Sequence, residues 1–178
     1  MTRADFLAHL RRLGACPEAR RWERKGKLSP ADTWATCRRG DWLLWLAAAA
    51  GVRRQDVVLA ACACARLALP RVHAGEDRPR IAIETAERWA RGEDASLDDV
   101  RSAAHAAHAA YAANAAAPYA PYAAHAAYAA HAAYAAAHAA AAAVARNRAL
   151  AECADLARER ILWSTVNAAL ARSNKEAA

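Results

Sequence analysis

The chain has 178 residues, with 25 lysines and arginines against 18 aspartates and glutamates, and a formal net charge of +7. That length fits one domain, and six tryptophans together with 57% hydrophobic residues argue against a disordered chain. Five cysteines, an odd number, do not favour a disulfide scaffold. No bulky apolar stretch approaches the roughly 20 residues that span a bilayer. Residues 1–13 carry charges inside their apolar stretch, so we expect no signal peptide and a cytoplasmic location.

Capping residues, first-turn prolines and terminal glycines follow one another along the first 92 residues and predict a series of helices. Counting their capping residues, these helices run from Thr2 to Gly14, from Pro17 to Gly26, from Ser29 to Gly40, from Asp41 to Gly51, from Gln55 to Leu69 and from Pro79 to Gly92. In this scheme Gly40 ends one helix and Asp41 caps the next. No segment alternates with the period of a strand, so the sequence predicts an all-α fold.

A capping-box spacing from Ser96 to Asp99 begins an alanine-rich region. Residues 102–145 contain no charged residue and repeat Ala-Ala-X, in which X is His, Tyr or Asn. A step of three residues turns a helix by about 300°, so the X side chains spiral around it and leave bare alanine elsewhere.

We expect one domain over residues 1–178. Its short-helix half, 1–92, packs on an antiparallel alanine-rich hairpin, 96–173, which breaks at 118–121 because prolines stand there. The second hairpin helix is expected to run from about 122 to 172.

Histidines and cysteines raise the possibility of a bound metal, but their spacing gives little support to it. Only His105 and His108 have the three-residue spacing that places two ligands on one helix face, so they are weak candidates. Cys62 and Cys64 are two apart and point to nearly opposite sides of a helix. We expect no cofactor, and a metal-binding protein remains a second alternative.

The excess positive charge lies almost entirely at one end of the chain. Residues 1–40 have a net charge of +6 and residues 41–178 only +1. Such a patch is either a solvated helix face, a site for an acidic protein partner or a site for nucleic acid phosphates. The candidate partner-binding residues are the basic and aromatic side chains Arg20, Arg21, Trp22, Arg24, Lys25, Arg38, Arg39 and Trp42.

Tryptophans are concentrated beside this basic end. Trp42 and Trp45 are three apart and share a helix face, which favours core packing; an exposed one would instead be an interface anchor. No phosphate-binding glycine loop, metalloprotease motif or nucleophile elbow is present in the linear sequence. We therefore expect a binding protein and not an enzyme, with a nucleic-acid-binding protein as the first alternative. Self-association through the bare alanine faces is also expected.

Three stretches together resemble a family of alanine-rich bacterial proteins. They are Trp34-x-x-Cys37-x-x-Gly40-Asp41-Trp42-Leu43-Leu44-Trp45-Leu46, the Leu59–Arg66 segment, and Arg78-Pro79-Arg80-x-Ala82-Ile83-Glu84 with the residues up to Gly92. The family is usually labelled as immunity proteins, relatives of the fifth-numbered immunity family of polymorphic toxin systems. The resemblance covers about residues 15–170. It implies an all-α protein that binds and neutralises a toxin made by the same cell or its kin, and it assigns no contact residues.

Overall fold

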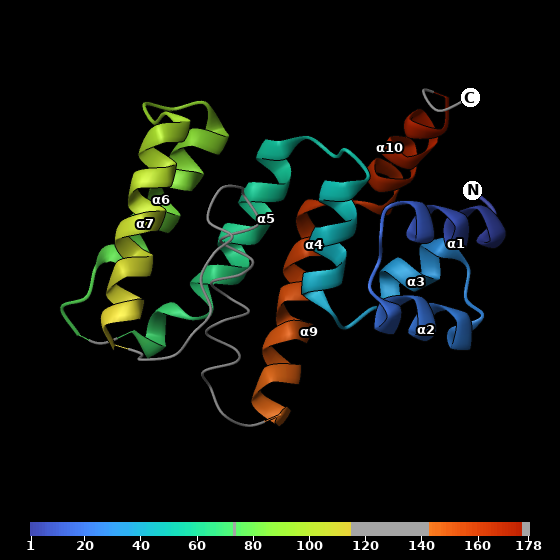
Figure 1. Cartoon of the computed structure of the whole chain (residues 1–178), viewed down its shortest axis with the longest axis horizontal. Coiled ribbons are helices and arrows are strands. Elements are labelled where there is room, and N and C mark those ends of the chain that lie inside the picture. Colours follow the sequence, from blue (N-terminus) through green and yellow to red (C-terminus); the bar gives the residue numbers. More distant parts are fainter. Residues whose placement is uncertain (73, 115–142, 176–178) are drawn as a thin grey trace.

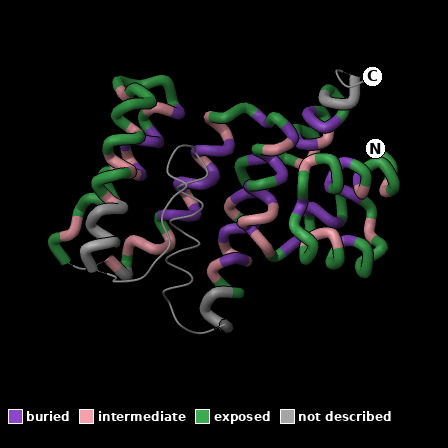
Figure 2. The backbone as a smooth tube through the Cα atoms, viewed as in Figure 1, coloured by how far each residue is buried: buried purple, intermediate pink, exposed green. Residues whose placement is uncertain are grey.

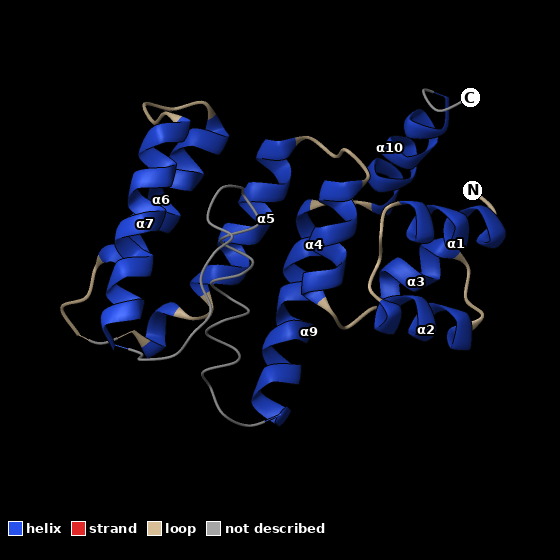
Figure 3. Cartoon of the chain, viewed as in Figure 1, coloured by secondary structure: helices blue, strands red, loops and turns tan. Residues whose placement is uncertain are grey.

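The computed structural model describes residues 1–72, 74–114 and 143–175. All regular structure among them is helical, as the sequence predicts (Figure 3). None of the helices in these ranges is both long enough and apolar enough to cross a membrane. The predicted turn at 118–121 lies outside the described residues, and the hairpin therefore stays a prediction.

The helices are labelled in chain order. Their bounds are α1 Arg3–Arg12, α2 Pro17–Gly26, α3 Pro30–Thr36, α4 Gly40–Ala49, α5 Arg54–Arg66, the 3₁₀ turn η1 Leu69–Arg71, α6 Arg78–Arg91, α7 Leu97–Asn114, α9 Ala143–Arg160 and α10 Trp163–Lys175.

Figure 1 shows α6 and α7 at one end of the long axis, followed by α5 and then by α4 and α9, with these helices standing roughly across that axis. α7 packs on α6, α6 packs on α5, and α5 packs on both α4 and α9. The short helices α1, α2 and α3 form the opposite end, where α10 also lies. This arrangement places the two predicted halves of the alanine-rich hairpin on different neighbours: α7 lies against α6, and α9 lies against α4 and α5.

Buried residues follow the facing sides of the helices (Figure 2). One apolar cluster joins α1, α3, α4, α5, α9 and α10, and a second joins α5 to α6. Much of this core is alanine, so helices can approach closely, and bulky residues fill the remaining space. At the short-helix end Trp163 supplies such bulk, because its ring contacts Phe6 edge-on at 5.8 Å between centroids and Trp34 at 6.2 Å.

Several local signals are confirmed. Thr2 and Asp5 form a reciprocal capping box, and Ser29 and Ser96 each accept a hydrogen bond from the backbone N–H three residues later. Gly92 ends α6 in the left-handed conformation with φ 76°, which favours glycine. The sequence thus specifies these helix ends through side-chain and backbone chemistry that acts over three or four residues.

The roles predicted for Gly40 and Asp41 are wrong. α3 ends at Thr36, and Gly40 is the first residue of α4 and not a stop. Asp41 lies inside the first turn, where it accepts two hydrogen bonds from Arg39 and caps nothing. The reason is tertiary: a Cβ placed at Gly40 would lie 2.4 Å from the Cβ of Cys153, so glycine lets α4 begin directly against α9.

The single long helix predicted up to about residue 172 is also wrong. α9 ends at Arg160, and α10 begins at Trp163 in a new direction. The break has no proline or glycine. It allows Ile161 to be buried and Trp163 to reach Phe6 and Trp34, so apolar packing at the short-helix end overrides the local helix propensity of the segment.

Candidate partner-binding surface

The helix α2 carries the charge that the sequence singled out. Four of its exposed or half-buried cations, Arg20, Arg21, Arg24 and Lys25, lie on about half of its circumference because residues advance by about 100° each. Its inward face contains Ala19 and a buried glutamate, Glu23. The N-cap of the helix is Cys16, whose Sγ accepts a hydrogen bond from the Ala19 N–H.

Trp22 joins this basic helix to α4. Its ring meets that of Trp42 edge-on, with 6.1 Å between the centroids, and the guanidinium of Arg39 lies 4.2 Å above the Trp42 ring. Arg39 is held there by two hydrogen bonds to Asp41, at 2.9 and 2.6 Å. The structure therefore brings three of the predicted site residues, Trp22, Arg39 and Trp42, into one contact. Arg38 is exposed in the preceding link, and no described contact joins it to these rings.

A pocket opens beside this contact. It is a small hollow that opens to solvent, with a cavity volume of about 40 Å³, room for no more than a few water molecules. The walls are mainly apolar and come from the aromatic residues of four helices together with leucines of α1 and α4. Trp22 and Trp45 are each 37% exposed, whereas Trp34 is 4% exposed, so the first two rings form the rim and Trp34 the interior. The core packing predicted for Trp45 is therefore wrong, because its ring faces solvent at the rim; an interface anchor at Trp45 stays a prediction.

Glu23 lines the same pocket, and sequence reasoning missed it. Its side chain is only 1% exposed, and Arg3 Nε lies 3.1 Å from its Oε1. Neither carboxylate oxygen accepts a well-aligned hydrogen bond from a described group. Burial raises the pKa of Glu23, and the charge of Arg3 opposes that effect. The sequence did contain one signal for a buried polar residue on α2. Because this helix has few apolar residues, any face of it that is buried must include a polar side chain.

The arginines of the chain differ in how their charge is balanced. Ion pairs within the described residues neutralise most of those beyond residue 50, including Arg53, Arg66, Arg78, Arg80, Arg88, Arg91, Arg101, Arg148, Arg158 and Arg160. In the same described part of the chain, no ion pair involves Arg20, Arg21, Arg24 or Lys25. These four cations of α2 therefore stand apart from the ion-paired arginines further along the chain, although the charge of Arg24 acts on the nearby Glu23 carboxyl.

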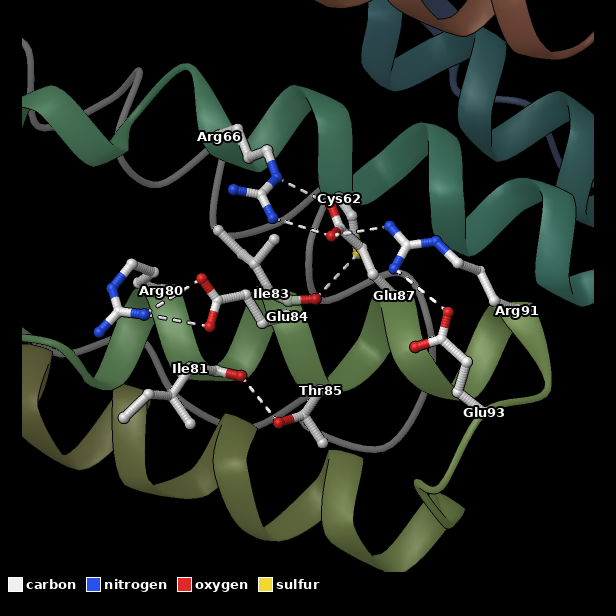
Figure 4. Close-up of polar contacts among 10 residues, drawn as sticks. All are labelled: Cys62, Arg66, Arg80, Ile81, Ile83, Glu84, Thr85, Glu87, Arg91 and Glu93. Atoms are coloured by element: carbon white, nitrogen blue, oxygen red, sulfur yellow. Dashed lines mark hydrogen bonds and ion pairs between the residues drawn. The ribbon is translucent and has the colours of Figure 1, made fainter.

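The other concentration of charge, between α5 and α6, has a structural role (Figure 4). Glu87 accepts two hydrogen bonds of 2.8 Å from Arg66 on α5 and one of 3.2 Å from Arg91 on its own helix. These contacts lower the pKa of Glu87. On the exposed side of the same helix, Arg80 and Glu84 form an ion pair of 3.1 Å. Because the carboxylate of Glu87 accepts from arginines on both helices, this cluster joins α5 to α6.

The cysteines and histidines described by the structure do not form a metal centre. No group of three or more His, Cys, Asp or Glu side chains within the described ranges could hold an ion. His105 is exposed, and the side chain of His108 lies outside those described. Cys62 contacts the Ile83 carbonyl of α6, and Cys64 that of Cys153 on α9, so they point apart as predicted. Burial raises the pKa of Cys62 to about 12, which keeps this thiol protonated near neutral pH.

Comparisons with protein-family models, curated proteins and solved structures gave no match to this chain.

Proposed function

We propose that this protein is a binding module without catalytic activity, and that it acts by covering the functional surface of a protein partner. The observation that supports this most is the group of α2 cations without an ion pair among the described residues, next to two exposed tryptophan rings, Trp22 and Trp45. Interfaces are enriched in tryptophan and arginine, which supply most of the binding energy at hot spots. A partner that fits this surface presents carboxylates around an apolar centre.

Within that class we propose an immunity protein, which neutralises a cognate bacterial toxin by stoichiometric binding. The support is the resemblance of the Gly40–Leu46 and Arg78–Glu84 stretches to the immunity family, together with a surface suited to an acidic partner. An inhibitor of this kind needs only to cover the toxin's functional site and performs no chemistry. The test is whether the purified protein abolishes the toxicity of the partner at a one-to-one ratio.

The partner is sought by affinity capture of tagged protein from extract of its native cells, read by mass spectrometry with and without nuclease. The proposal predicts one stoichiometric protein that survives nuclease treatment. Recovery of nucleic acid that is lost on treatment would overturn it in favour of the nucleic-acid alternative. In that case affinity for DNA would fall steeply with salt, because Lys and Arg contacts release counterions from the phosphates.

A further inference from the structure

Negative charge is concentrated in one short turn of the chain, residues 93–99, here called the acidic turn. It contains no lysine or arginine and has four acidic residues, Glu93, Asp94, Asp98 and Asp99. No other interval between successive lysines or arginines contains more than two acidic residues. The acidic turn therefore has a formal charge of −4, against +6 for residues 1–40.

The acidic turn is open to solvent where it connects α6 to the first turn of α7. The side chains of Asp94 and Asp98 are 83% and 87% exposed. Arg88 lies 3.5 Å from Asp94, and Arg101 lies 2.7 Å from Asp98. Exposed pairs of this kind contribute little free energy, so these carboxylates can exchange partners. Leu97 stands between them in the sequence and is 39% exposed.

The exposed side of α2 with the neighbouring ring of α4, here called the α2 surface, has the same pattern with the opposite charge. Arg21, Arg24 and Lys25 are exposed and form no ion pair with a described residue. The rings of Trp22 and Trp45 beside them are each 37% exposed. In both places charged side chains surround an exposed apolar group, so the two surfaces complement each other.

The two surfaces lie at opposite ends of the molecule. α1, α2 and α3 form one end of its long axis, and α6 and α7 stand at the other (Figure 1). The acidic turn of one molecule can therefore meet the α2 surface of another copy but not its own. Such a contact is heterologous, because two different surfaces meet, and it extends into chains unless it closes into a ring.

We propose that this protein associates head to tail with a second copy of itself, through the acidic turn of one molecule and the α2 surface of the next. Asp94 and Asp98 face the α2 cations, and Leu97 lies on the exposed faces of Trp22 and Trp45 without entering the hollow between them. This inference goes beyond the proposed function, because it needs no other protein. A copy bound in this way covers the surface proposed for the partner, so the partner competes with self-association.

Sedimentation equilibrium of the full-length protein, up to about 1 mM, tests for a contact of this weak class. We expect the average mass to exceed that of the monomer and to rise with concentration at about 0.1 M salt, where the Debye length is about 10 Å. At about 1 M salt the Debye length is about 3 Å, so the association constant should fall several-fold.

Two double variants each remove one of the surfaces. Asp94→Asn with Asp98→Asn neutralises the acidic turn, and Arg21→Ala with Arg24→Ala removes cations of the α2 surface. Each variant alone should associate about tenfold more weakly than the natural protein or not at all. An equimolar mixture should form a one-to-one complex with the strength of the natural contact, because each variant retains the surface that the other lacks.

Asp77→Asn with Glu159→Gln is the matched control for the acidic turn. It removes two carboxylates that are 66% and 67% exposed, and it gives the same net charge as the variant of the acidic turn. It should associate like the natural protein. Circular dichroism of each variant establishes that it is folded before masses are compared.

A natural protein that stays monomeric at the lower salt concentration would overturn the inference. Association that persists in both double variants, as pairing through alanine faces predicts, would also overturn it, as would a mixture that stays monomeric or an equal loss in the control variant. The proposed function fails separately, if capture from cells gives no stoichiometric protein.

Discussion

Replacement of Gly40 by alanine should destabilise the protein severely for a single added methyl group. The new Cβ would lie 2.4 Å from the Cβ of Cys153 and 2.7 Å from the backbone nitrogen of Ala154. Two of the three closest atoms belong to the backbone of α9, so no flexible side chain can turn away. Relief requires α4 and α9 to separate, which disturbs packing around Leu43 and Ala47.

The expected magnitude follows from overpacking in well-packed cores, which costs about 1–3 kcal/mol and sometimes more. Against this stands the stabilisation of about 0.4–1 kcal/mol that Gly→Ala gives where the backbone is unstrained, as it is at Gly40, whose φ is not positive. The difference is a net loss of between about 0 and 2.6 kcal/mol in the free energy of unfolding, and we expect the upper half of that range because the clash is with backbone atoms of α9. The loss is measured by urea titration with tryptophan fluorescence.

Gly26→Ala is the matched control for this experiment. Gly26 is also helical without a positive φ, but a Cβ there would meet only the Leu28 side chain, at 3.6 Å, an ordinary contact. This variant should be neutral or more stable by up to about 1 kcal/mol. If Gly40→Ala proved as stable as Gly26→Ala, the close contact between α4 and α9 would be refuted.

Three further predictions address other contacts. Glu87→Gln should lower the free energy of unfolding by about 1–2 kcal/mol, since the carboxylate that joins α5 to α6 is lost. Glu84→Gln, on the exposed side, should lower it by less than about 0.5 kcal/mol. Equal losses for the two variants would contradict the role of Glu87. Burial lowers the pKa of His9 below its usual 6.5, so its contribution to stability is present above pH 6.5 and is lost as the pH falls through its folded-state pKa. His9→Gln should reduce the fall in stability between pH 7 and about 5, and an unchanged pH profile would refute this. If alanine faces pair between molecules, the mass by sedimentation equilibrium should rise with concentration, and a constant monomer mass would exclude it.

Helix ends were predictable from the sequence where local chemistry decides them. Ser29, Ser96 and Gly92 act through their own side chains or backbone conformation, within one helical turn. The start of α4 and the break before Trp163 could not be predicted in this way. Gly40 matters for its contact with Cys153, more than a hundred residues later, and Trp163 for its contact with Phe6. Such long-range packing leaves no mark in the neighbouring sequence.

The candidate surface was also only partly predictable, because composition is visible in the sequence and tertiary contacts are not. The basic run of α2 is visible as composition, and Trp22 and Trp42 as aromatic residues within or close to basic runs. What the sequence could not show is that Trp22 meets Trp42, or that Glu23 turns inward while the arginines beside it stay unpaired. Those facts depend on how α1, α2 and α4 pack together.

The most direct test of the account is to repeat the capture of the protein partner with two variants of equal charge. Arg21→Ala with Arg24→Ala removes two exposed cations of α2 that form no ion pair with a described residue, and Arg54→Ala with Arg172→Ala removes two exposed arginines elsewhere. If α2 contacts an acidic partner, the first variant should lose about tenfold or more in affinity and the second should bind like the natural protein. Equal binding by both variants would contradict a binding surface on α2.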